Sequence, residues 1–280
     1  MRYIEIKAPA KINIGLSVLS KREDGFHNLS TLFYPIKDLF DLLTFELSSE
    51  FSFNCSDPSL PVGEENLVVK AKNLLEQVSG KKLNAKIGLI KNIPSQAGLG
   101  GGSSDAAAAL ISLNELFRLN LRSDHLRDLS LKLGSDVPFF LRSLPAIGKS
   151  RGEILEPVDL EITEPILIVN PRINISTKEA FQNIIPENSE PDYRSVIQNE
   201  RLNYRLMKAV VVNDFEKYAF ETFPEIEKIK KDLYGYGAVF AQMSGSGSTV
   251  YGIFPDMKSA EDAKKSFPTN YLCFLSNPHH

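Results

Sequence analysis

The chain has 280 residues, 42% of them hydrophobic and 24% charged, and its 32 basic against 35 acidic residues give a net charge of -3. This composition is typical of a globular protein with one large domain or two of ordinary size. The small net charge excludes a bulk attraction to nucleic acid or to an anionic membrane, so any anion must be bound locally. Cys55 and Cys273 lie far apart without metal-ligand spacing, which argues against a disulfide framework or a zinc site and fits a reducing cytoplasm.

Alternating polar and apolar residues open the chain, so we expect neither a signal nor a transit peptide. We predict strands at residues 3–8 and 12–19, joined by Pro9. One face of the second strand is polar and small, with Lys11, Asn13, Gly15 and Ser17. Such a face indicates either the wall of a binding site or a half-solvated sheet face. No apolar run approaches the roughly 18 residues that a membrane span needs.

A charged turn follows at residues 20–27, where Asp24-Gly25 is a strong turn signal. Phe26 and His27 at its end either anchor the turn or serve a site. Further strands are predicted at residues 41–47 and 51–55, and a helix at residues 66–78 has an apolar face.

The stretch from Gly98 to Ser104 reads GLGGGSS and leads into Asp105 and a run of alanines. Glycines let successive backbone N–H groups turn toward one ligand, and a following helix adds unpaired donors and a partial positive charge. We expect Ser103 or Ser104 to cap this helix and Asp105 to lie in its first turn. The stretch therefore predicts a cradle for a di- or triphosphate, the alternative being a solvated loop.

Two better-known phosphate motifs are excluded by inspection. The Rossmann pattern needs a third glycine where Ser103 stands, and a P-loop ending at Gly148-Lys149-Ser150 would need a glycine where Ser143 stands.

Beyond the cradle, a helix at residues 124–133 should end at Gly134. Asp136 follows, either as a helix cap with Pro138 in the first turn or as a functional acid. The remaining expected elements are a turn at 148–152, strands at 154–158, 166–170, 237–243, 249–254 and 271–275, a polar loop at 186–191, and helices from Thr177 and at 196–219, 224–233 and 258–267. This mixture predicts an α+β architecture in two halves, divided near residues 150–165. His279 and His280 receive no role.

Three segments together resemble a known superfamily: residues 9–13 (PAKIN), 94–107 and 243–249 (MSGSGST). They are similar to the motifs of the small-molecule kinase superfamily that comprises galactokinase, homoserine kinase, mevalonate kinase and phosphomevalonate kinase. Within this superfamily, PAKINIGL with the following DGFH, then GLGGGSSDAA and GSDVPFF, resemble the kinases of 4-diphosphocytidyl-2-C-methyl-D-erythritol. The resemblance covers essentially the whole chain.

The resemblance implies a role for each motif residue. Asp136 would be the catalytic base and Lys11 its partner. Phe26 and Phe181 would sandwich the cytosine ring, and His27 would read its edge. Asn13 and Thr177 would help hold the rest of the acceptor. The residues on the ATP side would be Asn66, Lys91, Pro94, Gly98, Leu99, Gly100, Gly101, Gly102, Ser103 and Ser104.

The implied activity is ATP-dependent phosphorylation of the acceptor's 2-hydroxyl in non-mevalonate isoprenoid synthesis, with Mg²⁺ expected and its ligands unassigned. The implied fold is a two-domain α+β kinase, with an ATP-binding domain like ribosomal protein S5 domain 2 at 1–155 and a ferredoxin-like, substrate-binding domain at 156–280. The protein is expected to be cytoplasmic, a monomer or weak homodimer, and to bind neither nucleic acid nor membrane. The sequence departs from the family where Phe26 replaces a common tyrosine and Asp105 a frequent asparagine.

Two rival interpretations stay open. One is a kinase of the same superfamily acting on homoserine, mevalonate or a sugar. The other is a nucleotide-binding protein without catalysis, against which the presence of both Lys11 and Asp136 argues.

Overall fold

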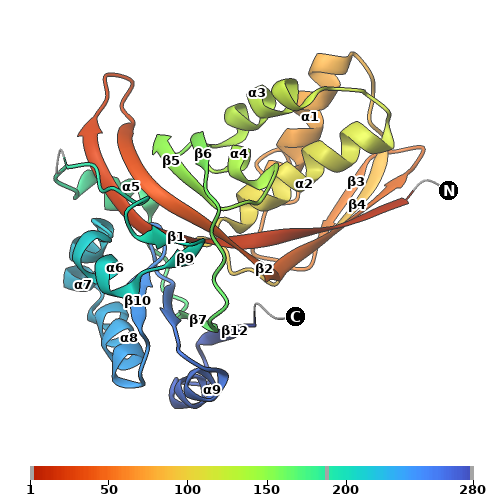
Figure 1. Cartoon of the computed structure of the whole chain (residues 1–280). Helices are drawn as coiled ribbons and strands as arrows, with labels where there is room; N and C mark the ends of the chain where they lie inside the picture. Colours follow the sequence, from red (N-terminus) through yellow and green to blue (C-terminus); the bar gives the residue numbers. More distant parts are fainter. Residues whose placement is uncertain (1–2, 187–188, 278–280) are drawn as a thin grey trace. The chain divides into compact units, whose positions relative to one another are not determined.

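The computed structural model describes residues 3–186 and 189–277, and His279, His280 and the middle of the predicted loop 186–191 lie outside these ranges (Figure 1). The chain divides into two compact units. The first unit comprises the chain up to Ala10, then Leu39–Ser95 and Gly100–Leu144; the second comprises Lys11–Asp38, Gln96–Leu99 and the chain from Pro145 on.

Two long strands contribute residues to both units. β1 (Tyr3–Lys21) is one strand where two joined by Pro9 were predicted, and β2 (His27–Leu47) begins well before the predicted residue 41. β1 lies off the main path of its sheet, where it pairs with β2, and such an edge position tolerates a proline within a strand. The early part of β2 was missed because its residues do not alternate strictly and include Pro35.

The first unit places helices against one face of its strands. Its other elements are β3 (Ser52–Cys55), α1 (Leu67–Ser79), β4 (Ala85–Ile90), α2 (Gly101–Leu116), α3 (Ser123–Leu133) and α4 (Val137–Phe140). β4 pairs antiparallel with the end of β2 and parallel with β3. In Figure 1 the helices α1, α2 and α3 lie together beside β3 and β4. Their apolar faces form one core that includes Phe45, Leu75, Ile87 and Leu113.

Local chemistry explains the limits of α1 and α3. The Asn66 side chain accepts a hydrogen bond from the Val68 N–H at 2.9 Å and so caps α1, which ends at Gly80 in the left-handed region with φ 66°. The helix expected at 66–78 is therefore confirmed. So is the helix expected at 124–133, which ends at Gly134 as predicted.

The second unit combines a small sheet with several helices. Its elements are β5 (Ala146–Ser150), β6 (Ile154–Pro157), β7 (Ile166–Asn170), α5 (Thr177–Gln182), β8 (Ile197–Gln198), β9 (Arg201–Leu202), α6 (Tyr204–Val210), α7 (Phe215–Thr222), α8 (Pro224–Gly235), β10 (Phe240–Met243), β11 (Val250–Ile253), α9 (Met257–Ser266) and β12 (Leu272–Ser276). The main sheet has the antiparallel order β10-β11-β7-β12. Helices separate β7 from β10 and β11 from β12 along the chain, which is the ferredoxin-like arrangement.

The second unit has an apolar core of its own. It includes Leu167 and Val169 of β7, Val250 of β11, Leu233 of α8 and Ala260 of α9. The four residues from Ile166 to Val169 are all buried, so this strand reads as a continuous apolar run rather than an alternation.

Two predictions in this unit were wrong. The helix expected at 196–219 is the hairpin β8–β9 followed by the short helices α6 and α7. Asn199 and Glu200 both have positive φ, which makes the tight turn of that hairpin, and the Asn203 side chain then caps α6. The turn expected at 148–152 begins later, because β5 continues to Ser150.

The α+β class is confirmed. Among the described residues, no helix combines the length and the apolarity that crossing a membrane would need.

Candidate functional site

Two glycine-rich segments pack backbone against backbone in the second unit. The Ser244 hydroxyl donates to the Gly98 carbonyl at 2.8 Å, and the Thr249 N–H donates to the Ala97 carbonyl at 3.3 Å. A Cβ at Gly98 would overlap the carbonyl oxygen of Ser244 and lie 3.2 Å from that of Gly247. Gly98 also has a φ of +76°, so both the space and the backbone conformation require glycine here.

The strand segment Lys11–Asn13 joins these two loops. The Lys11 N–H donates to the Leu99 carbonyl at 3.0 Å, and the Lys11 ammonium donates to the Gly98 carbonyl at 2.9 Å and to Asn13 Oδ1 at 2.5 Å. The Asn13 N–H donates to the Ser244 hydroxyl at 3.1 Å. The three segments with the superfamily motifs therefore meet within the second unit, at Lys11, Gly98 and Ser244.

The polar face of β1 is buried. Lys11 and Asn13 are 3% and 2% exposed, which excludes a half-solvated sheet face for them. Burying an ammonium is costly unless hydrogen bonds compensate it, and the carbonyl and amide oxygens around Lys11 supply that compensation. The result is a lysine held in one orientation next to the glycine loop.

The start of helix α2 lies in the first unit. Gly100 is its N-cap with φ 72°, and α2 begins at Gly101. Ser103 and Ser104 are inside the helix and do not cap it, so that prediction was wrong, and Asp105 is the fifth helical residue rather than part of the first turn. The first backbone N–H groups of a helix lack intrahelical partners and carry partial positive charge, so Gly101 and Gly102 present donors suited to a phosphate.

Lys91 is held between two buried carboxylates. Its ammonium pairs with Asp105 Oδ2 at 2.8 Å and with Asp41 Oδ2, and the three side chains are 6%, 4% and 0% exposed. Asp41 also accepts the backbone N–H groups of Asn92 and Ile93 at 2.6 and 2.9 Å. A Cβ at Gly101 would lie 3.3 Å from the Lys91 ammonium, so this cluster adjoins the first residue of α2.

The cluster shifts two pKa values. Burial alone would lower the pKa of Lys91, but the carboxylates of Asp105 and Asp41 raise it. Burial, together with the negative charge of Asp41, raises the pKa of Asp105 to about 7 against the opposing effect of Lys91. Sequence reasoning missed Asp41, because only the antiparallel register that pairs Leu42 with Ile90 brings it to Lys91.

Stability should therefore depend on pH through Asp105. An acid whose folded pKa is raised stabilises the fold below its unfolded pKa of 3.8, and this contribution is lost as pH rises through about 7. Between those limits the free energy of unfolding of the wild type should fall, relative to Asp105→Asn, by up to about 1.4 kcal/mol per pH unit. Urea denaturation of both proteins at pH 5 and pH 8 measures the difference in their free energies of unfolding. The same difference at both pH values would contradict a role of Asp105 in the pH dependence.

The predicted acceptor residues lie in the second unit. The rings of His27 and Phe181 stack with centroids 5.0 Å apart and an angle of 19° between planes, and Phe181 meets Phe215 edge-on at 4.8 Å. The Thr177 hydroxyl bonds that of Ser246 at 3.1 Å, next to the glycine-rich turn. Burial, and then the positive charge of Lys21, lower the pKa of His27, which favours the neutral ring with one donor and one acceptor. Phe26 is 51% exposed, and the guanidinium of Arg151 lies over its ring.

Asp136 precedes the short helix α4 in the first unit. It occupies the N-cap position with Pro138 near the helix start, as expected, but its side chain makes no capping bond to the described residues of that helix. Its side chain therefore does not serve as the cap, and its role as base stays a prediction. Asn66 and Lys91 have the structural partners described above, and their contacts to a nucleotide stay predictions too.

Comparison with known proteins places this arrangement in a family. Two family models match, GHMP kinases N terminal domain over residues 66–143 and GHMP kinases C terminal over residues 179–272. A 4-diphosphocytidyl-2-C-methyl-D-erythritol kinase of Bacteroides thetaiotaomicron is 42% identical over 95% of this chain and 96% of its own. A protein of the same name from Chlorobium limicola is 41% identical over 94% of this chain and 92% of its own.

Solved structures of kinases from the same class also match this chain. The crystal structure of 4-(cytidine 5′-diphospho)-2C-methyl-D-erythritol kinase matches with a TM-score of 0.81 and 33% identity, covering 97% of this chain and 98% of that one. A homoserine kinase of Cytophaga hutchinsonii shares the fold, with a TM-score of 0.70, 18% identity and coverage of 99% and 95% of the two chains.

The fold, the glycine loop and the two matching models define the class as the GHMP kinases, with two α+β domains. Within that class, the chain belongs to the family of 4-diphosphocytidyl-2-C-methyl-D-erythritol kinases.

Proposed function

We propose that this protein transfers the γ-phosphoryl group of ATP to the 2-hydroxyl of 4-diphosphocytidyl-2-C-methyl-D-erythritol, giving the 2-phosphate and ADP. This reaction serves the synthesis of isopentenyl diphosphate by the non-mevalonate route. The observation that carries the proposal is identity of about 40% over nearly the full length of several 4-diphosphocytidyl-2-C-methyl-D-erythritol kinases. The meeting of Lys11, Gly98 and Ser244 supports it, since these belong to the three superfamily motifs.

The phosphates of ATP are proposed to bind along the glycine loop. Phosphoryl transfer requires mainly positioning and stabilisation of negative charge, which backbone N–H groups at a helix start and a lysine supply. Gly98 to Ser104 would hold the phosphates through the main chain. Asn66, Lys91 and Pro94 would line the nucleotide side, with Lys91 held in place by Asp41 and Asp105.

Magnesium is proposed to arrive with ATP rather than to occupy a protein cage. Among the described residues, no group of three or more His, Cys, Asp or Glu side chains is arranged to hold a metal. Mg²⁺ keeps several waters and binds through one or two carboxylates plus phosphates. Ser104 Oγ and Asp105 Oδ1 are buried and without a hydrogen-bond partner among the described residues, and such hard oxygens fit this ion. When bound, the ion would neutralise charge on the phosphates.

Asp136 is proposed as the general base and Lys11 as its partner. A carboxylate near the acceptor hydroxyl takes its proton as the phosphoryl group transfers, and the Lys11 ammonium would polarise that hydroxyl. The ordered ammonium of Lys11, held by Gly98 and Asn13, supports this assignment because a fixed charge costs no reorganisation during the reaction.

The acceptor is proposed to bind through its base and its diphosphate. Phe26 and Phe181 would stack on the cytosine, His27 would hydrogen-bond its edge, and Asn13 and Thr177 would hold the rest. Stacking alone tolerates any base, so the neutral His27 ring would make the choice. In the present structure His27 covers Phe181, so cytosine would have to displace that stack or extend it.

The assignment of ATP binding and substrate binding to two domains also stays a proposal. Residues 1–155 would form the ATP-binding domain, and residues 156–280 would contribute to substrate binding. We further propose a cytoplasmic monomer or weak homodimer that needs neither nucleic acid nor membrane.

Release of ADP tests the proposed reaction. The protein is incubated with ATP and Mg²⁺ plus the cytidyl substrate, homoserine, mevalonate, galactose or water alone. ADP formation that depends on the cytidyl substrate is expected. ADP formed with one of the simple alcohols instead would favour another superfamily activity, and no ADP with any acceptor would favour a binding protein without catalysis.

Truncation of Phe181 should separate the two substrates. One stacked base contributes about 1–3 kcal/mol, so Phe181→Ala should raise the KM for the cytidyl substrate roughly 5- to 150-fold and leave the KM for ATP nearly unchanged. Because Phe181 also packs on Phe215, the melting temperature of the variant must be checked. Phe26→Ala, at a half-exposed ring, is the companion variant with less structural cost. An equal rise in both KM values would contradict the stacking role.

A further inference from the structure

The side chain of Arg151 packs against the ring of the exposed residue Phe26. The guanidinium carbon of Arg151 lies 4.8 Å from the centroid of this ring, at the tip of the β5–β6 hairpin. An arginine over an aromatic face is attracted by the negative electrostatic potential of that face. The same contact covers one face of Phe26, so a base would stack on the other.

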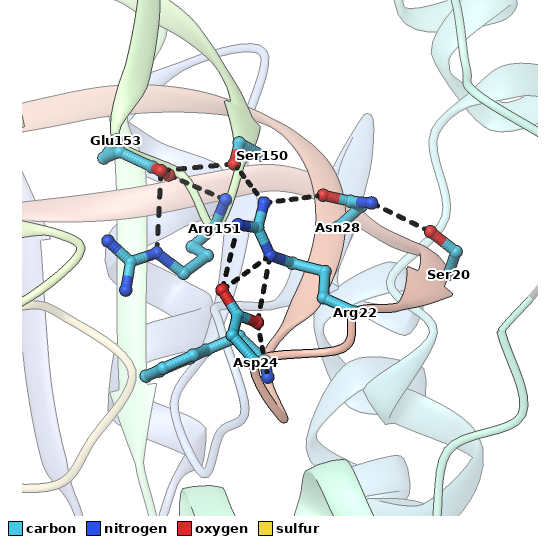
Figure 2. Close-up of polar contacts among 8 residues, drawn as sticks. Ser20, Arg22, Asp24, Asn28, Ser150, Arg151 and Glu153 are labelled. Carbon is cyan, nitrogen blue, oxygen red and sulfur yellow. Dashed lines mark hydrogen bonds and ion pairs between the residues drawn. The ribbon is translucent and has the colours of Figure 1, made fainter.

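Arg151 is itself held by its own hairpin. Glu153 Oε2 accepts the Arg151 backbone N–H at 2.7 Å, and Glu153 Oε1 lies 3.5 Å from Arg151 Nε (Figure 2). Ser150 donates to Glu153 Oε1 at 3.1 Å and has a φ of 62°, a left-handed conformation that is costly for a residue with a Cβ. The turn therefore accepts backbone strain and aims Arg151 at Phe26.

Hydrogen bonds of Arg22 and Asp24 hold the turn between β1 and β2 in place. Arg22 donates through Nη2 to Asp24 Oδ2 at 2.9 Å and through Nη1 to Ser150 Oγ at 2.9 Å. Asp24 Oδ1 accepts the Phe26 backbone N–H at 3.1 Å, and the bond from Arg22 lowers the pKa of Asp24. Figure 2 shows these side chains converging between the two turns, with Asn28 and Ser20 extending the set.

These contacts form a closed ring of interactions, called the circuit below, that begins and ends at Phe26. It runs from the Phe26 backbone to Asp24, Arg22, Ser150, Glu153 and Arg151, and returns to the Phe26 ring. Fixing an aromatic in its binding orientation before the ligand arrives removes an entropy cost from binding.

We propose that Arg151, oriented by Glu153, is a positioning residue that holds Phe26 as the stacking platform for the cytosine of the acceptor. This inference rests on the proposed function. Arg151 acts through the Phe26 ring and needs no contact with the substrate. A purely structural role, in which the circuit only fastens two turns together, would affect stability without distinguishing the two substrates.

Arg151→Met tests the proposal because it keeps the length of the side chain and removes the cation. The KM for the cytidyl substrate should rise about two- to fivefold, the loss expected for one exposed cation–π contact, while kcat and the KM for ATP stay unchanged. Arg151→Lys should recover part of the loss. The matched control is Arg194→Met, at an exposed arginine of the same unit that pairs with Glu156 at 3.3 Å, and it should leave all three constants unchanged.

A double-mutant cycle separates positioning from direct contact. In a Phe26→Ala background, Arg151→Met should cause no further rise in the KM for the cytidyl substrate. The same fold rise in both backgrounds would mean that Arg151 contacts the substrate itself and would overturn the proposal. A lower melting temperature with an unchanged KM would overturn it as well.

Binding of cytidine 5′-diphosphate, measured by calorimetry, keeps this test distinct from that of the proposed function. If the wild type binds this ligand but does not phosphorylate the cytidyl substrate, the proposed function fails and Arg151→Met must still weaken binding. Equal binding by the wild type and Arg151→Met would overturn the inference alone. A wild type that neither binds nor reacts would overturn both.

Discussion

Replacing Asp136 by asparagine is expected to lower kcat by on the order of 100- to 10,000-fold, the usual contribution of a positioned general base. Asparagine has nearly the same shape as aspartate but cannot accept the proton of the acceptor hydroxyl. Because the ATP phosphates are proposed to bind through the glycine loop, the dissociation constant of ATP should stay nearly unchanged. Steady-state kinetics with the cytidyl substrate and calorimetric titration with ATP measure the two quantities.

Asp124→Asn is the control for this variant. Asp124 lies in the same unit at the start of α3, and its side chain is 61% exposed. Its replacement should leave kcat unchanged. Full activity of Asp136→Asn would remove the assignment of the base.

Replacing Gly98 by alanine is expected to destabilise the protein and to disturb the phosphate loop. The new Cβ would overlap the Ser244 carbonyl oxygen, and the φ of +76° is unfavourable for alanine. Overpacking typically costs about 1–3 kcal/mol, and the backbone conformation adds about 1 kcal/mol more. The free energy of unfolding should therefore fall by at least about 2 kcal/mol, as measured by urea denaturation, and the KM for ATP should rise.

The comparison for Gly98 is Gly102→Ala. A Cβ at Gly102 would meet only Leu67 at an ordinary 3.7 Å, and Gly102 lies inside α2, where alanine is the better helix former. This variant should be as stable as the wild type or slightly more stable. If Gly98→Ala were as stable as Gly102→Ala, the close packing of the two glycine-rich segments would be wrong.

Elements with strong local signals were predicted well from the sequence. The helices α1 and α3 have an apolar face and a glycine at their ends, and these features fix their limits. The early part of β2 and the hairpin β8–β9 have no such periodicity. Their conformation depends on strand pairing and on the positive φ of Asn199 and Glu200, which local patterns do not reveal.

In the site, too, features with a local sequence signal could be predicted, and features that depend on tertiary structure could not. The sequence showed the three motif segments at residues 9–13, 94–107 and 243–249 but not their contacts, and the structure brings Lys11, Gly98 and Ser244 of these segments together within the second unit. The capping role expected for Ser103 or Ser104 was wrong, because Gly100 in the left-handed region starts α2 one turn earlier. Asp41 and Arg151 could not be found from the sequence, since strand register brings the first to Lys91 and a hairpin turn brings the second to Phe26.

Proton-coupled phosphorus NMR of the product shows which hydroxyl of the acceptor has received the phosphoryl group. The 2-carbon of the proposed acceptor bears a methyl group and no hydrogen, so a phosphate monoester at this position has no three-bond coupling to a proton. After reaction of ATP with the cytidyl substrate, we expect ADP plus one new monoester signal without that splitting. A monoester signal split by protons on the ester carbon, or no new monoester beside the ADP, would contradict it.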